Sequence, residues 1–322
     1  MNIHQLKAIC EIVKQGLRMS TAAEALFTSK PGISRQVKEI EDEIGVRLFE
    51  RRKNKIEALT PAGREIVAIA ERILRDIETV RQIGKEHSRN DAGELVVATT
   101  HTHARYCLPK VIDSFTREFP KVKVILQQGK PGQCCELVAT GGADIAICTE
   151  TSPSCCNVIS LPVYRVERCI VARRNHPILK LKRLTLEKLA QYPIITFDAA
   201  FGGQKIVTDA FSRAGIQPHV ILSVADPEVA KAYVERGMGV TIVAKVAFNA
   251  RIDRSLQVID AEHLFKSSML HVTLRKQPYL RGYVYSFISL YAPHLSKELV
   301  LQAIQGSKVD IPRLEQEMPL LA

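Results

Sequence analysis

Residues 28–38 read TSKPGISRQVK and predict the start of a helix. Ser29 or Lys30 ends a short turn, and Pro31 suits the first helical turn because its missing N–H would have no partner there. The residues that follow place an apolar stripe along one side of the predicted helix. Its members are Ile33, Val37, Ile40 and Ile44.

The opposite side of this helix is polar, with Ser34, Arg35 and Lys38 near its N-terminus. That placement suits a recognition helix, whose first turns reach base edges and phosphates in a DNA major groove. The alternative is a solvated polar face on a small helical domain. Upstream, residues 3–14 have the apolar spacing of an amphipathic helix, and Thr21–Glu24 fits a capping box at the start of another.

The segment after the recognition helix favours DNA binding. Gly45 can end the helix, and two short strands, 46–50 and 56–59, can flank the basic run 51–55. A basic hairpin after a helix-turn-helix is a wing that meets the DNA backbone or minor groove. The expected DNA-binding residues are Ser29, Lys30, Pro31, Ser34, Arg35, Lys38, Arg51, Arg52 and Lys53.

A long helix is predicted from Pro61 to about His87. Apolar residues line one side of it at near-heptad spacing, and a helix of this length with one apolar seam usually buries the seam against another chain. We therefore expect it to join two copies of the protein. The seam comprises Ile66, Ile69, Ala70, Ile73, Leu74, Ile77, Val80 and Ile83.

The length and composition of the chain limit the number of domains and the classes of partner. The 322 residues suggest two or three compact domains, and the net charge of +11 favours a polyanionic partner. No run approaches the ~20 apolar residues of a membrane helix, so we expect no membrane association and a cytoplasmic location. The eight cysteines include the pairs Cys134-Cys135 and Cys155-Cys156 but no C-x-x-C, so we expect buried thiols and no metal or cofactor.

Beyond residues 89–93 the pattern changes to short β-branched runs that alternate with helical segments. This order predicts an α/β fold with mostly parallel sheets covered on both faces. The run 269–275 returns to the first set of strands, so we expect two lobes joined by crossing strands. The predicted strands are 94–99, 122–127, 145–148, 168–172, 194–197, 220–223, 240–243 and 269–275, and the predicted helices are 104–119, 132–140, 203–214, 226–237 and 280–291.

A ligand site is predicted between these lobes. Thr99–Thr102 follow a strand and precede a helix, and ligands of open α/β sheets bind beyond the carboxyl ends of the strands. Hydroxyls and free N–H groups there suit an anion, although ordinary helix capping is the alternative. Thr149 ends another strand at the same crevice, and the turn Phe201–Gly203 faces it from the second lobe.

Residues 1–65 resemble the winged helix-turn-helix of LysR-type transcriptional regulators. The resemblance rests on the order and spacing of residues 21–23, 29–34, 41–45, 48–49 and 60–63, and it continues to about residue 305. Within this family the chain is similar to the CysB-like branch, which regulates sulfur assimilation and cysteine biosynthesis. The stretches that carry this closer similarity are 98–106, 189–193 and 291–295.

The resemblance implies a complete architecture. It comprises an N-terminal winged helix-turn-helix at 1–61, a long linker (dimerisation) helix at 62–88 and a two-lobed, periplasmic-binding-protein-like effector domain at 89–306. Lobe I would take about 92–162 and 268–295, and lobe II about 163–267. Residues 307–322 are expected to be a loosely held tail. A homotetramer that binds promoter DNA is implied, and RNA polymerase is a further candidate partner.

The branch also implies the effector-contacting residues, with two departures. Where the branch offers glutamine this chain has His103, which can become cationic near its ordinary pKa of ~6.5. Where it offers threonine this chain has Gly202, which lets the backbone approach a ligand closely. The expected effector is an acetylserine-like metabolite or a sulfur oxyanion, and a regulator of organosulfur (sulfonate) use is the alternative. The residues expected to bind it are Thr100, Thr102, His103, Thr149, Phe201 and Gly202.

Two other classes compete with a regulator. An α/β enzyme could use Cys107 or Cys148 as a nucleophile, but no catalytic motif has recognisable local context, and no phosphate- or dinucleotide-binding fingerprint is present. A solute-binding protein would have a signal peptide in place of the basic helical N-terminal region. We therefore expect an effector-controlled transcription factor without catalytic activity.

Overall fold

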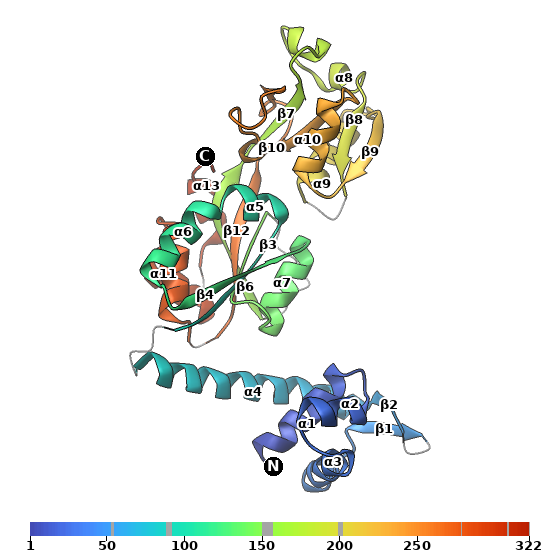
Figure 1. Ribbon diagram of the computed structural model, residues 1–322, viewed down its shortest axis with the longest axis vertical. Helices are drawn as coiled ribbons and strands as arrows, with labels where there is room; N and C mark the ends of the chain where they lie inside the picture. The colour runs from blue at the N-terminus through green and yellow to red at the C-terminus, as the bar shows by residue number, and fades with distance from the viewer. Residues whose placement is uncertain are drawn as a thin grey trace. The chain divides into compact units, whose positions relative to one another are not determined.

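The computed structural model describes residues 1–52, 55–87, 92–149, 157–198, 202–277, 279–307 and 309–321. The chain divides into two compact units, Met1–Asn90 and Asp91–Ala322. Figure 1 shows their elements in order along the chain. Within the described residues, no helix combines the length and the apolar character needed to cross a membrane.

The first unit is a helix-turn-helix with a wing. It consists of α1 (Ile3–Lys14), α2 (Met19–Ala25), α3 (Lys30–Ile44), β1 (Phe49–Arg52), β2 (Lys55–Leu59) and α4 (Pro61–His87). The predicted recognition helix is α3. The Ser29 hydroxyl accepts from the Gly32 N–H at 3.2 Å, and Gly45 ends the helix with a φ of 72°. The stripe residues Ile33, Val37 and Ile40 are buried, as their spacing predicted.

The predicted capping box at Thr21–Glu24 is wrong. Gly16 and Leu17 both adopt positive φ values, so the chain has completed its turn by Arg18. Helix α2 therefore begins at Met19, and Thr21 lies inside it without a capping role.

The wing is held by a carboxylate of the recognition helix. Glu41 Oε1 accepts from the Leu48 and Phe49 N–H groups at 2.8 and 3.4 Å, and Glu41 Oε2 lies 3.4 Å from Arg51 Nη2. Because Gly45 and Val46 still belong to the turn and bend that follow α3, β1 begins at Phe49, later than the predicted start at 46. Strand β1 then pairs antiparallel with β2.

The apolar side of α4 is divided between two roles. Val67 and Ala70 are buried in the core of the first unit, and Ile66, Ile73 and Leu74 pack against the same core. By contrast, the side chains of Ile69 and Val80 are 47% and 69% exposed. Part of the predicted seam therefore belongs to the chain's own core, which a heptad pattern alone does not reveal.

The second unit contains two five-stranded sheets, each part of one lobe. The sheet of lobe I has the order β4-β3-β5-β12-β6, with β4, β3 and β5 parallel and β12 antiparallel to both β5 and β6. Its strands are β3 (Gly93–Thr99), β4 (Val122–Gln128), β5 (Ile145–Cys148), β6 (Val158–Val166) and β12 (Ser268–Arg275). Its helices are α5 (His101–Tyr106), α6 (Pro109–Glu118), α7 (Pro131–Thr140), α11 (Gly282–Tyr291), α12 (Lys297–Ile304) and α13 (Ile311–Glu317).

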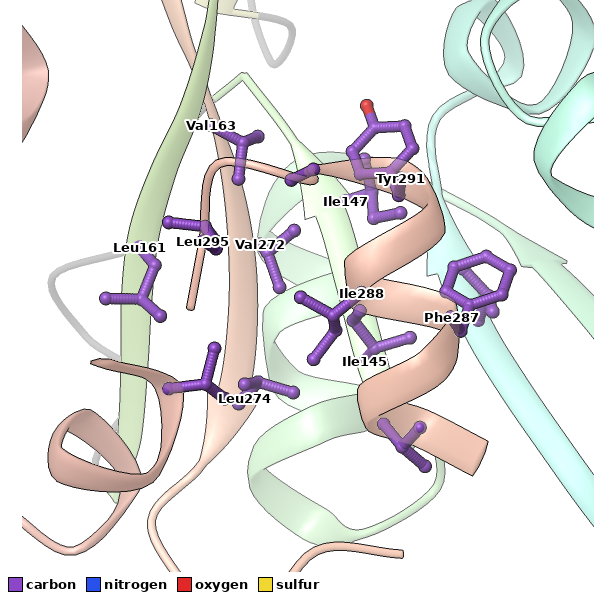
Figure 2. Close-up of a cluster of buried hydrophobic side chains, with 14 of the residues drawn as sticks. Ile145, Ile147, Leu161, Val163, Val272, Leu274, Phe287, Ile288, Tyr291 and Leu295 are labelled. Atoms are coloured by element: carbon purple, nitrogen blue, oxygen red, sulfur yellow. The ribbon is translucent and has the colours of Figure 1, made fainter. Parts of the chain in front are cut away.

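The core of lobe I lies between this sheet and helices α6, α11 and α12. Figure 2 shows α11 against the sheet, with Phe287, Ile288 and Tyr291 on the helix and residues such as Ile145 and Val272 on the strands. Helix α7 packs on the other face over a second apolar cluster. Because both faces are covered, the carboxyl ends of the strands are left as the place for a ligand.

Lobe II has the sheet order β11-β7-β10-β8-β9, in which β10, β8 and β9 are parallel and β7 is antiparallel to β10 and β11. Two segments cross between the lobes, one from β6 to β7 and one from β11 to β12. The predicted two-lobed α/β class is thus confirmed. The strands are β7 (Arg168–Arg173), β8 (Ile194–Phe197), β9 (Val220–Val224), β10 (Val240–Ala244) and β11 (Leu256–Asp260), and the helices are α8 (Leu186–Leu189), α9 (Gly202–Arg213), α10 (Pro227–Glu235) and the short η1 (Pro177–Lys180) and η2 (Lys245–Ala247).

The expectation of a loosely held tail at 307–322 is wrong. Helix α13 is followed by a segment in which Met318 is only 5% exposed. The Arg165 N–H donates to the Pro319 carbonyl at 2.8 Å, and the Leu321 N–H donates to the Arg165 carbonyl at 2.9 Å. Backbone pairing at the edge strand β6 thus holds the segment in place.

Candidate functional sites

A pocket lies where the two lobes of the second unit meet at their crossing strands. Lobe I contributes the start of α5 and the end of β5, and lobe II contributes the start of α9 and strands β7, β8 and β10. Its volume is about 90 Å³, and one water molecule needs ~10–15 Å³, so a small polar ligand fits. The polar residues in its lining are Thr100, His101, Thr102, His103, Thr149, Arg168, Gln204 and Ser268.

Four of the six residues expected to bind an effector line this pocket. They are Thr100, Thr102, His103 and Thr149. Gly202 begins α9, but its neighbour Gly203 is the residue of that turn in the lining. Phe201 lies outside the described residues.

His103 is buried against Thr100, with 3% of its surface exposed. Its Nδ1 lies 2.8 Å from Thr100 Oγ1, while its Nε2 has no hydrogen-bond partner in the described part of the chain. Burial lowers the pKa of the imidazole to about 4. The expectation that His103 titrates near pH 6.5 is therefore wrong. At neutral pH the ring is uncharged and offers one nitrogen to a ligand.

Four polar residues of the lining were not predicted, namely His101, Arg168, Gln204 and Ser268, and Arg168 is the charged one among them. It is the first residue of β7, and only 5% of its surface is exposed. Its Nη1 donates to the Lys266 carbonyl at 3.2 Å and its Nη2 to Ser268 Oγ at 2.6 Å. Burial lowers its pKa to about 10, so it still carries its charge at neutral pH. A basic residue opening an apolar strand resembles an ordinary strand boundary, and nothing local in the sequence marks it as buried.

Polar contacts also join the lobes beside the pocket. Arg105 Nη2 lies 3.2 Å from Glu228 Oε2, and Lys130 Nζ lies 2.7 Å from Asp198 Oδ2. These groups are partly exposed, and such pairs contribute ~0–1 kcal/mol each. A more buried contact lies beside them, since Lys231 Nζ of lobe II donates to Tyr106 Oη of lobe I at 3.1 Å and Lys231 is only 3% exposed.

The thiols give little support to a catalytic role. Cys134, Cys135, Cys148 and Cys169 are buried, as expected. Burial raises the pKa of Cys107 to about 12, which keeps it from being a thiolate nucleophile at neutral pH. The Cys155-Cys156 pair lies outside the described residues.

The first unit presents most of the predicted DNA-binding residues on its surface. Arg35 Nε lies 2.8 Å from Glu39 Oε1, so it must exchange this partner to reach DNA. Arg51 forms an ion pair with Glu41, and Lys53 lies outside the described residues. Phe27, in the turn before α3, was missed; it is 99% exposed and has a φ of 51°. The exposed predicted residues are Ser29, Lys30, Pro31, Arg35, Lys38, Arg51 and Arg52, and Ser34 is half-buried.

Both units match known protein families. The description "Bacterial regulatory helix-turn-helix protein, lysR family" matches residues 3–64, and "LysR substrate binding domain" matches residues 88–296. The chain is 43% identical over 306 residues to the HTH-type transcriptional regulator CysB of Burkholderia cenocepacia, covering 95% of this chain and 98% of the relative. It is 42% identical over 297 residues to the HTH-type transcriptional regulator SsuR of the same organism, covering 92% and 96%.

A solved structure supports the second unit in particular. The cofactor-binding domain of the Cbl transcriptional regulator is 34% identical, with a TM-score of 0.64, and covers 67% of this chain and 95% of that domain. The predicted resemblance to CysB-like regulators is confirmed by these matches. Since the relatives are named as transcriptional regulators, they also favour a regulator over an enzyme.

The buried imidazole predicts a pH effect on stability. The pKa of His103 is lower in the folded chain than in the unfolded one, so the unfolded state gains protons first as pH falls. The wild type should thus lose up to about 3 kcal/mol of folding free energy between pH 6.5 and 4 through this group. His103→Gln removes that loss. In urea unfolding, the free energy of unfolding of the variant should therefore rise relative to that of the wild type as pH falls. Exposed His219→Gln controls for the substitution, and a pH-independent difference at His103 would contradict the prediction.

Proposed function

The chain belongs to the LysR family of bacterial transcriptional regulators, and on that premise we propose that it controls sulfur-assimilation and cysteine-biosynthesis genes in response to a small anionic effector. Its similarity to CysB supports this choice of genes. A second candidate within the same class is a regulator of organosulfur (sulfonate) use, with which the two departures at His103 and Gly202 are compatible. Both candidates require promoter DNA as partner and a cytoplasmic location.

The pocket chemistry is the observation that carries the proposal. Thr100, Thr102 and Thr149 line a space that is also lined by His103, whose Nε2 has no partner in the described chain, and by the cationic side chain of Arg168. The Thr100 hydroxyl donates its one hydrogen to His103 Nδ1, which leaves Nε2 as an N–H donor. That N–H, the Thr102 and Thr149 hydroxyls and the guanidinium are donors that suit the oxygens of a sulfur oxyanion or a carboxylate.

A ligand in this pocket contacts both lobes at once. The ligand stabilises the arrangement of the two lobes in which the donors of the pocket lie closest to it. It shifts the equilibrium between lobe arrangements only as far as its affinity differs between them. In an oligomer, the resulting change in how lobes dock would alter the spacing of the DNA-binding domains. We assign residues 1–61 to DNA, 62–88 to dimerisation and 89–306 to the effector, and the described residues 309–321 pack on lobe I.

Assembly follows from the exposed part of α4. Ile69 and Val80 present apolar surface that the described part of the chain leaves uncovered. We infer that a second copy covers it, giving the paired domains that a pseudo-palindromic operator requires, and that a further contact completes a homotetramer. RNA polymerase is the candidate partner for activation at a bound promoter.

The DNA-facing surface predicts two kinds of variant. Arg35→Ala should cost ~1–3 kcal/mol of operator affinity and relax specificity at one position, because Arg35 reads a base from the major groove. Arg52→Ala should weaken binding on all sequences and reduce the salt slope by ~1, because a wing contact to phosphate is sequence-independent. Gel shifts on operator and scrambled DNA would measure both, with Arg117→Ala in lobe I as the charge control. Identical behaviour of the two variants on every sequence would contradict this division.

The assembly inference predicts that Ile69→Asp splits the tetramer at its α4 contact and lowers operator affinity without altering a DNA-facing residue. Burying an unpaired carboxylate in an apolar interface is strongly unfavourable. Ala68→Asp introduces the same charge at an exposed neighbouring position and should leave assembly intact. Analytical ultracentrifugation of the two variants decides the matter, and an Ile69→Asp protein of unchanged mass would place the interface elsewhere. Ile73→Asp is a poorer probe because Ile73 packs in the core of its own chain.

The effector proposal is tested by Thr102→Val, which removes a hydroxyl while keeping the side-chain shape. We expect at least tenfold weaker binding of acetylserine or sulfate and loss of the effector response, with basal operator affinity within about twofold of wild type; tenfold corresponds to about 1.4 kcal/mol. Thr116→Val, on α6 outside the pocket, is the matched control. Calorimetry and fluorescence anisotropy on the full chain give the two readouts. Unchanged effector affinity in Thr102→Val would refute the assignment of this pocket.

A further inference from the structure

Arg168 stands at the point where the chain passes from lobe I to lobe II. It opens β7, directly after the first crossing segment, and its guanidinium donates to Lys266 on the second crossing segment and to Ser268, where that segment joins β12. One side chain therefore ties together the two connections between the lobes.

This guanidinium is buried beside neutral partners only. A carbonyl and a hydroxyl take two of its donors, whereas a guanidinium has five. Among the residues that the structure describes, no carboxylate forms an ion pair with it. Buried charges in proteins are normally paired with an opposite charge, so this one leaves room for an anion.

The start of α9 approaches Arg168 closely. A Cβ at position 203 would lie 3.0 Å from Arg168 Nη2, so the glycine lets the start of α9 lie directly against the guanidinium. The same pocket is lined from lobe I by His103, whose buried Nε2 lacks a partner in the described chain. A ligand in this pocket therefore has both a fixed positive charge and a neutral imidazole nitrogen available to it.

We propose that Arg168 recognises the charge of a tetrahedral oxyanion in this pocket and discriminates between dianions and monoanions. The inference rests on the proposed effector function and adds the residue that determines specificity for ligand charge. Because the same guanidinium holds both crossing segments, an anion bound to it also acts on the connections between the lobes.

The test uses calorimetry on the full chain with inorganic sulfate and methanesulfonate, which have similar shape but charges of −2 and −1. Arg168→Gln should weaken sulfate binding at least tenfold. Coulomb energy scales with ligand charge, so the corresponding loss for methanesulfonate should be only about threefold. Arg168→Lys keeps the positive charge but lacks the planar pair of guanidinium N–H donors. Compared with Arg168→Gln, it should restore most of the discrimination between sulfate and methanesulfonate.

The outcomes separate recognition from a purely structural role. Thermal unfolding without ligand establishes that each variant is folded. If Arg168→Gln does not fold, the two anions are compared on Arg168→Lys and the wild type. Equal losses for the two anions, or no rescue by lysine, would show that Arg168 only supports the fold and would overturn the inference.

The proposed function fails in a distinguishable way. Loss of sulfate binding in Thr102→Val together with full binding in Arg168→Gln would leave the pocket assignment standing and overturn the role of Arg168. Full sulfate binding in both variants would place the effector elsewhere and overturn both proposals.

Discussion

Insertion of β12 between β5 and β6 is the constraint on which the second unit depends. The chain leaves lobe I after β6, builds all of lobe II, and returns at Ser268 to pair antiparallel with both strands. This return completes the sheet of lobe I and places the two crossing segments next to each other. The pocket lies at this crossing, so the same pairing that completes the fold also brings Thr100, Arg168 and Ser268 to one place.

Local signals explain why much of the architecture could be predicted. Serine before proline and glycine after the apolar stripe define α3 through backbone chemistry that needs no tertiary contact. The β-branched runs of β3, β5 and β10 are buried on both faces and stand out from their surroundings. The threonines of the pocket were found because a strand followed by a helix fixes where its polar residues point.

Long-range contacts explain what was missed. Strands β6 and β11 were not predicted, since each is partly exposed and obtains its pairing from strands distant in the sequence. The role of Arg168 depends on Lys266 and Ser268, which only the fold brings to it. The shift of the His103 pKa likewise comes from burial, which a residue type does not disclose. In each case the deciding quantity was desolvation or pairing rather than local propensity.

The packed C-terminal segment has a consequence for the exposed edge of the lobe I sheet. Strand β6 is an edge of the lobe I sheet, and an uncovered edge offers N–H and C=O groups to any other strand. Leu320 lies parallel to Arg165 on that edge, beside the buried Met318. Pro319 and Leu321 thus occupy the backbone N–H and C=O of Arg165, so at this residue the edge is closed to pairing with a strand of another molecule.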